Sequence, residues 1–314
     1  MSERPSLRLG RALIALVLVL SIVAVFVAAF ARAPSGGDLA ARTRAFEREH
    51  RVTALPLSRI ALVVREAAVA TEDERFYRHS GVDLIALLRA VPFDVSHLSF
   101  AQGASTIAEQ LAKVVYLGGN DHSLSRKTRE VVLGYRLGHR YRHETILDAY
   151  LNVVYLGEGQ YGVMNGAHHY FGRDARRLSL SQASLLIGLI QAPSLYDPRN
   201  DPLAARWRQV EVLRSMVRNG YATEEEARAA VAWPLRLATG ASLPALARVS
   251  FVVGAPFDYA ELAAALVMLL IAVVALVLGR ILSPPVPARS LIRVASVGLL
   301  LVSVLTAAHS VQVV

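Results

Sequence analysis

An uncharged apolar segment near the start of the chain, residues 12–31, most constrains what this sequence can fold into. It is bordered by Arg11 and Arg32, and an α-helix needs about 20 apolar residues to cross the hydrocarbon core of a bilayer. A cleaved signal peptide is the alternative, because Ala29-Phe30-Ala31 is similar to a cleavage site. The apolar part of a signal peptide is only ~7–15 residues long, so the sequence favours an uncleaved anchor.

Two further apolar segments, residues 262–279 and 294–308, are candidate membrane helices near the C-terminus. Arginines precede the first span and also lie in the linker 280–293, so the positive-inside rule places both in the cytoplasm. The two late spans either form a hairpin by themselves or pack with the first. The predicted organisation is a cytoplasmic N-terminus with an anchor (1–32), an extracytoplasmic domain (33–238), a linker (239–258) and a two-span C-terminal hairpin (259–314).

The composition excludes several classes of protein. Hydrophobic residues make up 54% of the chain and the mean hydropathy is +0.39, which is high for a soluble protein. The chain has no cysteine, which excludes disulfides and thiol catalysis. Its net charge of +9 suits anionic lipid headgroups or a phosphate-bearing substrate. Nucleic acid is disfavoured as a partner, because the sequence has no zinc-finger, RNP or helix-turn-helix signature.

The region between the first and second spans is predicted to be mostly helical. Apolar residues within 60–67 recur with the spacing of one helix face, after start signals at Pro56 and Ser58. Residues 206–219 show the same periodicity. Thr223 and Glu226 have the spacing of a capping box that opens the next helix. No segment shows the alternation of a strand set.

The first polar cluster, ATEDERFYRHSG at residues 70–81, places Glu72 and Asp73 at the end of an apolar segment. Thr71 and Glu74 have the spacing of a capping box, so one interpretation is that the carboxylates only decorate a helix start. The functional interpretation makes Glu72 a general base whose pKa is tuned by partial burial.

The second cluster, QGASTIAEQLAK, opens a predicted helix. Thr106, Gln110 and Lys113 recur on one polar face, and Thr106 with Glu109 has capping-box spacing. An ordinary capped helix explains this pattern. The same features suit a phosphate, because free backbone N–H groups at a helix start, followed by a lysine two turns along, attract an anion.

The third cluster, SRKTRE, has three cations in four residues. Arg126 and Glu130 are spaced as an i, i+4 salt bridge, which is the structural interpretation. The alternative is that these cations neutralise a diphosphate leaving group and that Glu130 orients them.

The fourth cluster, HETILDAYLN, has the apolar spacing of a helix and is followed by a glycine-rich loop at 157–162. The adjacent pair His168-His169 could suggest a metal. Neighbouring residues on a helix point about 100° apart, so we expect no metal there.

In this order, the clusters resemble glycosyltransferase family 51, the peptidoglycan glycosyltransferase domain of class A penicillin-binding proteins and of monofunctional transglycosylases. The resemblance covers roughly residues 45–235. The matching pieces are ATEDERFYRHSG, QGASTIAEQLAK, SRKTRE, HETILDAYLN with YLGEGQYGV, and ASLLIGLIQAPSLYDP.

The resemblance implies a mainly α-helical, lysozyme-like domain beside a membrane. Enzymes of this family polymerise lipid II: a sugar hydroxyl attacks the anomeric carbon of a growing glycan held on undecaprenyl diphosphate. No cofactor is required, although magnesium or manganese can accompany the diphosphate. The implied partners are lipid II, lipid-linked glycan, the bacterial membrane and other cell-wall synthesis proteins. The implied location is the bacterial inner membrane, with several spans and the catalytic domain on its periplasmic face.

The resemblance also implies roles for individual residues. Glu72 matches the general base that deprotonates the hydroxyl, and Glu130 matches a second essential carboxylate near the diphosphate. The cations on the phosphates are matched by Lys113, Arg126 and Lys127. The helix start that contacts donor or acceptor is matched by Ser105, Thr106 and Gln110. The residues that shape the first motif are matched by Asp73, Phe76 and His79.

The chain departs from the family pattern at several positions. The pair Ala108-Glu109 stands where Thr-Gln or similar is usual, and Glu109 adds a negative charge that would oppose diphosphate binding. His143 and Asp148 stand where Lys and Glu are usual, with Arg142 as a substitute cation. No Ser-x-x-Lys run of a transpeptidase follows residue 235.

Two other functions compete with glycosyl transfer. A lysozyme-like hydrolase would need an acid together with a nucleophile or water site, and it would have no use for the cation cluster. A catalytically weakened scaffold of the cell-wall machinery would explain the departures, but not the retention of both Glu72 and Glu130.

Overall fold

The computed structural model describes residues 30–86, 105–118, 124–246 and 249–251, with four isolated positions before residue 30. Residues 29–256 form one compact unit. Its helices are α2 (Leu39–Glu49), α3 (Leu62–Glu72), α5 (Ile107–Ala112), α6 (Leu124–Arg140), α7 (His143–Val153), α8 (Val163–Phe171), α9 (Leu180–Gly188), α10 (Pro202–Arg218) and α11 (Glu224–Ala232). Short helical turns are η1 (Leu57–Arg59), η2 (Phe76–Arg78), η3 (Lys113–Leu117), η4 (Ala175–Arg177) and η5 (Leu189–Gln191).

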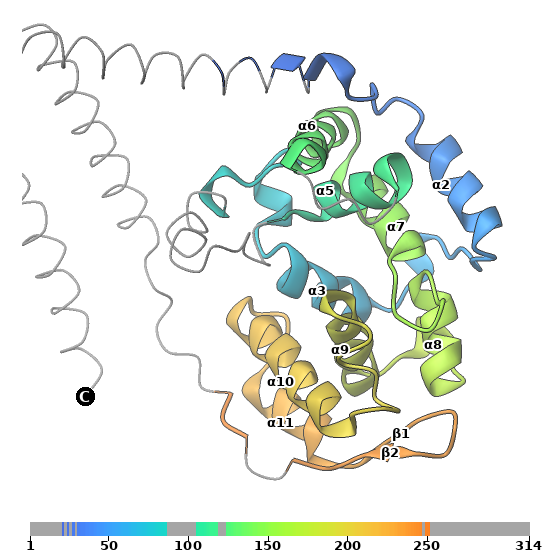
Figure 1. The fold of residues 1–314 in the computed structure, drawn as a ribbon. Helices are drawn as coiled ribbons and strands as arrows, with labels where there is room; N and C mark the ends of the chain where they lie inside the picture. The colour runs from blue at the N-terminus through green and yellow to red at the C-terminus, as the bar shows by residue number, and fades with distance from the viewer. Residues whose placement is uncertain are drawn as a thin grey trace, which may run out of the picture. The chain divides into compact units, whose positions relative to one another are not determined.

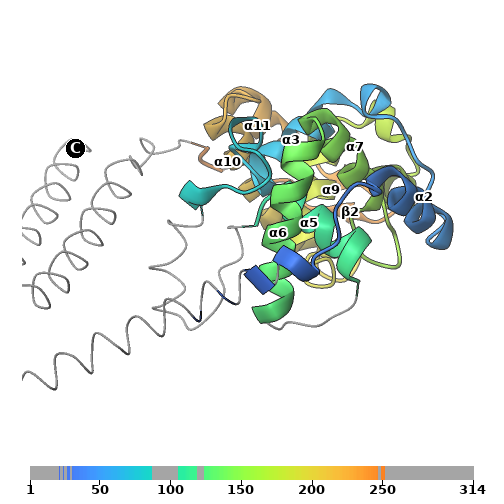
Figure 2. The ribbon, with the colours of Figure 1, turned by 90° about the horizontal axis from the view of Figure 1, so that it is seen from above.

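The helices form two groups that meet at α3 (Figure 1). In one group α5 packs against α6 and α7, and in the other α10 packs against α9, α11 and α3. Viewed from above, α6 runs beside α5 (Figure 2). Apolar side chains from both groups join one core, so the end of α3 is held from two sides.

Most predicted helices of the domain are confirmed. The periodic segment 206–219 lies in α10 up to Arg218, with Asn219 as the C-cap, and α10 starts earlier because Asp201 caps the backbone N–H groups of Leu203 and Ala204. The capping box of Thr223 and Glu226 is present with both of its hydrogen bonds. The helix after Pro56 begins only at Leu62, because η1 intervenes.

A two-stranded antiparallel ribbon, β1 (Leu235–Arg236) with β2 (Ser242–Leu243), was not predicted. β2 lies in the segment that the sequence favours as a linker, and Leu243 and Phe251 are fully buried there. Strands of two residues are too short to show alternation, which is why the pattern gave no signal. The domain boundaries themselves stay predictions.

Among the described residues, no helix is both long enough and apolar enough to cross a membrane. Residues 262–279, 294–308 and the linker 280–293 lie outside the described part, and so does most of the segment 12–31.

Candidate active site

Glu72 is the last residue of α3, where the two helix groups meet. Its Oε2 accepts a hydrogen bond of 2.9 Å from Nε2 of Gln110 on α5, and Oε1 of Gln110 accepts one of 2.9 Å from the Tyr150 hydroxyl on α7. An ionised carboxylate can only accept hydrogen bonds. The amide of Gln110 must therefore turn its NH₂ group to Glu72 and its oxygen to Tyr150, so Tyr150 fixes the orientation of Gln110.

Burial raises the pKa of the Glu72 carboxyl. The hydrogen bond from Gln110 and the positive charge of Arg208 act in the opposite direction, while Asp73 adds to the rise, and the net result is a raised pKa. Burial disfavours the charged form of a carboxyl. A carboxylate with a raised pKa accepts a proton more readily, which suits a general base.

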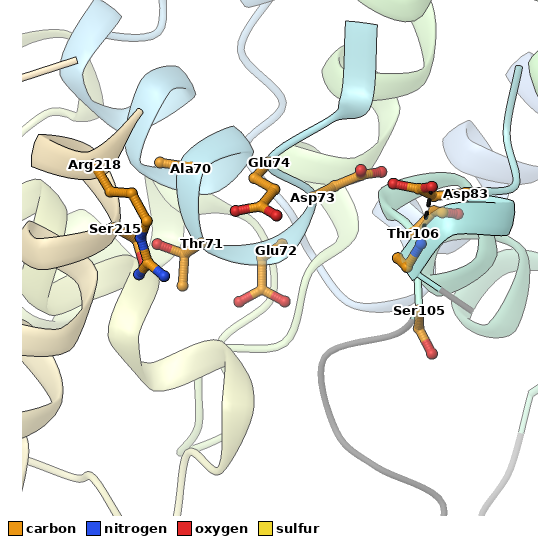
Figure 3. Close-up of a pocket in the computed structure, with 11 residues that line it drawn as sticks. Ala70, Thr71, Glu72, Asp73, Glu74, Asp83, Ser105, Thr106, Ser215 and Arg218 are labelled. Atoms are coloured by element: carbon orange, nitrogen blue, oxygen red, sulfur yellow. Dashed lines mark hydrogen bonds between the residues drawn. The ribbon is translucent and has the colours of Figure 1, made fainter. Parts of the chain in front are cut away.

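Glu72 faces a polar pocket beside the end of α3. Figure 3 shows Glu72 between Arg218 of α10 on one side and Ser105 on the other. The residues that line this pocket are Ala70, Thr71, Glu72, Asp73, Glu74, Asp83, Ala86, Ser105, Thr106, Ser215 and Arg218. Ser215 and Arg218 were missed by the sequence analysis, because α10 carries no local signal that it approaches Glu72.

Asp73 is buried and holds two neighbouring segments together. One carboxylate oxygen accepts from the backbone N–H of Ile107 at 3.0 Å, and the other lies 2.8 Å from Nε2 of His79. The interpretation of Thr71 and Glu74 as a helix start is wrong, because α3 ends at Glu72 and Asp73 serves the first turn of α5 instead.

Neighbouring acids raise the pKa of His79. Burial of the ring lowers its pKa, but the hydrogen bond with Asp73 and the charges of Asp73 and Asp83 outweigh this, so the pKa of His79 is raised. The ring is thus a structural partner of Asp73 rather than a group that faces the open pocket.

Phe76, in the same motif, is buried. The His143 ring meets the Phe76 ring edge-on at 5.0 Å between centroids, and His143 Nε2 lies 2.9 Å from the carbonyl oxygen of His79. His143 therefore contacts the first motif directly. Arg142, the expected substitute cation, is exposed and pairs with Glu144 at 3.3 Å.

Thr106 is buried at the start of α5. Its hydroxyl donates to the carbonyl oxygen of Gly81 at 2.7 Å and accepts from the backbone N–H of Glu109 at 3.2 Å. The predicted N-cap is confirmed, but the side chain of Glu109 does not return to close a capping box. It points instead toward α6.

The third motif forms a charge cluster on α6. Lys127 Nζ lies 2.7 Å from the Ser105 hydroxyl, 2.8 Å from Glu109 Oε2 and 3.5 Å from Glu130 Oε2. Arg126 Nε lies 3.5 Å from Glu130 Oε1, and both side chains are buried. The predicted i, i+4 ion pair is therefore present as part of a larger cluster. We call this cluster, formed by Glu109, Arg126, Lys127 and Glu130, the 109–130 charge cluster.

Ser105 joins the two halves of the site. It lines the pocket of Glu72 and also contacts Lys127 of the charge cluster. Lys113, by contrast, is exposed where α5 passes into η3, and the structure places no ion-pair partner from the described residues on it. The sequence-predicted residues thus fall into a base region, a charge cluster and the separate Lys113.

One group of side chains within the described ranges has the spacing of metal ligands. Ligand atoms of Asp73, His79 and Asp83 lie within 4.8 Å of one another. These atoms already have partners in the protein, since Asp73 bonds to His79 and Ile107, and Asp83 pairs with Arg75 at 3.1 Å. His168 and His169 are not members of this group.

Comparison with known proteins identifies the domain. The family model described as Transglycosylase matches residues 37–217. A protein of Cupriavidus necator, provisionally named a transglycosylase, is 38% identical over 232 residues, covering 73% of this chain and 99% of that protein. Penicillin-binding protein 1A of Neisseria gonorrhoeae is 40% identical over 164 residues, covering 52% of this chain and 20% of that protein. The solved structure of penicillin-binding protein 1A from Haemophilus influenzae is 26% identical with a TM-score of 0.29, covering 42% of this chain and 16% of that chain.

The mainly helical domain is that of a glycosyl-transferring enzyme. The chain belongs to the transglycosylase family, because the family match spans more than half of it and a relative is matched over nearly its full length. The predicted class of enzyme, a peptidoglycan glycosyltransferase, is confirmed at this level. The chain spans about a fifth of penicillin-binding protein 1A, so the match concerns the transglycosylase part alone.

Proposed function

We propose that this chain polymerises lipid II at a membrane surface, with Glu72 as the general base. The observation that carries the proposal is the position of Glu72 in a polar pocket whose wall, Ser105, contacts the 109–130 charge cluster. A base inside a pocket, with a cluster that contains cations next to one wall of that pocket, suits a reaction that deprotonates a hydroxyl and releases a diphosphate.

In the proposed reaction the 4-hydroxyl oxygen of the acceptor sugar forms a bond to the anomeric carbon of the donor. The bond from that carbon to the diphosphate oxygen breaks, and its electron pair leaves with undecaprenyl diphosphate. The hydroxyl proton passes to Glu72. Cations stabilise the charge that develops on the leaving group, a role proposed for Arg126, Lys127 and Lys113. Magnesium or manganese on the diphosphate stays a prediction.

The membrane location is part of the same proposal. It rests on the apolar segments 12–31, 262–279 and 294–308, each long enough or nearly long enough to span a bilayer. A polyprenyl-linked substrate does not leave the bilayer, and a tethered catalytic domain meets it in a favourable orientation. Other cell-wall synthesis proteins are proposed partners.

Product size separates transfer from hydrolysis. The detergent-solubilised full chain is incubated in parallel with lipid II and with finished glycan strands, and the products are separated by length. Growth of glycan from lipid II, with finished strands left intact, is the expected result. Shortening of finished strands without growth would identify a hydrolase and overturn the proposal.

Complementation separates an enzyme from a scaffold. A bacterial strain whose own peptidoglycan transglycosylases are depleted should grow with the wild-type chain and fail with the Glu72→Gln variant, at matched levels of both proteins. Growth with Glu72→Gln would favour the scaffold, because a scaffold needs the fold and not the base.

The pH dependence of polymerisation should report the raised pKa of Glu72. The active form of a general base is the carboxylate, so activity is present above the folded-state pKa and is lost as pH falls through it. We expect the acid limb of kcat/KM to lie above the ordinary glutamate pKa of about 4.3, because burial raises the pKa of Glu72. An acid limb at or below that ordinary value would contradict this environment for the base.

Tyr150→Phe should lower activity because it disturbs the hydrogen bond that Gln110 donates to Glu72. Without the tyrosine hydroxyl, the amide oxygen of Gln110 loses its donor, and the orientation that supports the Glu72 carboxylate is no longer fixed. A net hydrogen bond is worth about 0.5–1.5 kcal/mol, so we expect kcat to fall about two- to tenfold and the acid limb to move to higher pH. Tyr170→Phe is the control, because its hydroxyl donates to the Leu156 carbonyl oxygen, away from Glu72. Equal pH profiles for the two variants would contradict the role of Tyr150.

A further inference from the structure

The ammonium group of Lys127 has three polar neighbours within the protein, although its side chain is 34% exposed. An ammonium has three N–H donors and no acceptor. Around Lys127 Nζ lie the Ser105 hydroxyl at 2.7 Å, Glu109 Oε2 at 2.8 Å and Glu130 Oε2 at 3.5 Å. A phosphate oxygen that approaches Lys127 therefore competes with these three groups.

Glu109 is the nearer of the two carboxylates around Lys127 Nζ, and the fold leaves space for its side chain. Its side chain is 4% exposed. A Cβ atom added at Gly134 on α6 would lie 2.8 Å from Cγ of Glu109, so the glycine leaves the space that this side chain fills. Burial raises the pKa of Glu109, while the neighbouring ammonium of Lys127 lowers it and the carboxylate of Glu130 adds to the rise.

The cluster is electrically balanced because of Glu109. Arg126 and Lys127 carry two positive charges, and Glu109 and Glu130 carry two negative charges at contacts of 2.8–3.5 Å. A neutral side chain at position 109 would leave one net positive charge in this cluster. The charge on Glu109 therefore sets the net charge of these four residues.

We propose that Glu109 is an internal competitor for Lys127 and that it weakens the binding of Lys127 to the diphosphate of the lipid-linked donor. This inference rests on the proposed function, and it makes Glu109 a residue that sets the affinity of the enzyme for diphosphates. Glu109 does not touch the reacting atoms. It acts by holding Lys127 in a 2.8 Å ion pair that offsets its charge.

Binding of inorganic pyrophosphate by the detergent-solubilised full chain tests the inference without requiring catalysis. Titration calorimetry compares wild type, Glu109→Gln and the control Glu224→Gln, which removes an exposed glutamate paired with Arg228 on α11. We expect Glu109→Gln to bind pyrophosphate about tenfold more tightly, which corresponds to about 1.4 kcal/mol, and Glu224→Gln to bind like wild type. No gain for Glu109→Gln, an equal gain for both variants, or no binding by any of the proteins would overturn the inference.

A second background shows whether the effect passes through Lys127. Glu109→Gln is repeated on Lys127→Met, with the thermal midpoint of each variant measured first. Because the proposed competition is for Lys127, the gain should disappear in that background, as in a double-mutant cycle between coupled residues. An undiminished gain would mean a general charge effect and would overturn the inference. If Lys127→Met does not fold, the comparison with Glu224→Gln decides alone.

The two hypotheses can fail separately. Polymerisation of lipid II by wild type reports on the proposed function, whatever the affinity for pyrophosphate. A wild-type enzyme that polymerises lipid II, with an unchanged pyrophosphate affinity in Glu109→Gln, would leave the function in place and remove the inference about Glu109.

Discussion

Replacement of Glu72 by glutamine should lower kcat for lipid II polymerisation by about 10²–10⁴-fold, the usual contribution of a positioned general base. Glutamine has nearly the same shape and can still accept the hydrogen bond from Gln110, so the fold should persist while the proton acceptor is lost. The measurement is the initial rate of polymerisation by purified full chains, with the thermal midpoint recorded for each.

Glu66→Gln is the matched control for that experiment. Glu66 lies on the same helix, α3, and burial also raises its pKa, but it does not line the pocket of Glu72. We expect its rate to stay within about twofold of wild type, as for a substitution away from special features. A Glu72→Gln variant that keeps more than about a tenth of the wild-type rate would rule out Glu72 as the base.

Gly138→Ala should be strongly destabilising, because the added Cβ atom would clash with backbone beside the site. A Cβ atom at Gly138 on α6 would lie 2.3 Å from the backbone nitrogen of Gly81 and 2.3 Å from the carbonyl carbon of Ser80. Backbone atoms cannot yield as a flexible side chain can. Overpacking of this kind costs about 1–3 kcal/mol or more, and we expect the thermal midpoint to fall by about 3–10 °C.

The loop at Ser80 and Gly81, which Gly138→Ala would displace, also supports the site. Gly81 accepts a hydrogen bond from Thr106, the N-cap of α5, and follows His79, the partner of Asp73. Gly188→Ala on α9 is the control, because the atom nearest to the added Cβ is Cγ of the flexible Arg208 side chain at 3.1 Å, while Val212 and the Arg208 backbone lie at ordinary contact distances of 3.6 and 3.7 Å, and alanine favours a helix. An equal fall in the midpoint for both variants would contradict a specific clash at Gly138.

The sequence predicted those features that depend on local pattern. The helix over 206–219, the capping box at Thr223 and the N-cap at Thr106 follow from side-chain spacing and backbone chemistry, which operate within a few residues. The motifs and their order along the chain were enough to predict the class of enzyme. Each motif resembles one motif of the family, and the five in that order are specific to it.

Features that depend on contacts between distant segments could not be predicted. Asp73 accepts a hydrogen bond from the first turn of α5 and not from a helix in its own segment. Arg218 reaches the pocket from α10. Tyr150 has the spacing of a core residue, and nothing in that spacing shows that its hydroxyl orients Gln110. The sequence showed that Glu109 adds a negative charge, but not that Lys127 is its partner.

The central claim is that Glu72 drives transfer of a sugar from a lipid diphosphate to a sugar hydroxyl. Its most direct test counts products of wild-type enzyme acting on lipid II: new glycosidic bonds, released undecaprenyl diphosphate and free reducing sugar ends. Transfer predicts one diphosphate lipid released for each glycosidic bond formed, with no free reducing ends. Release of diphosphate lipid together with reducing ends, and without new glycosidic bonds, would show that water is the acceptor and would contradict the claim.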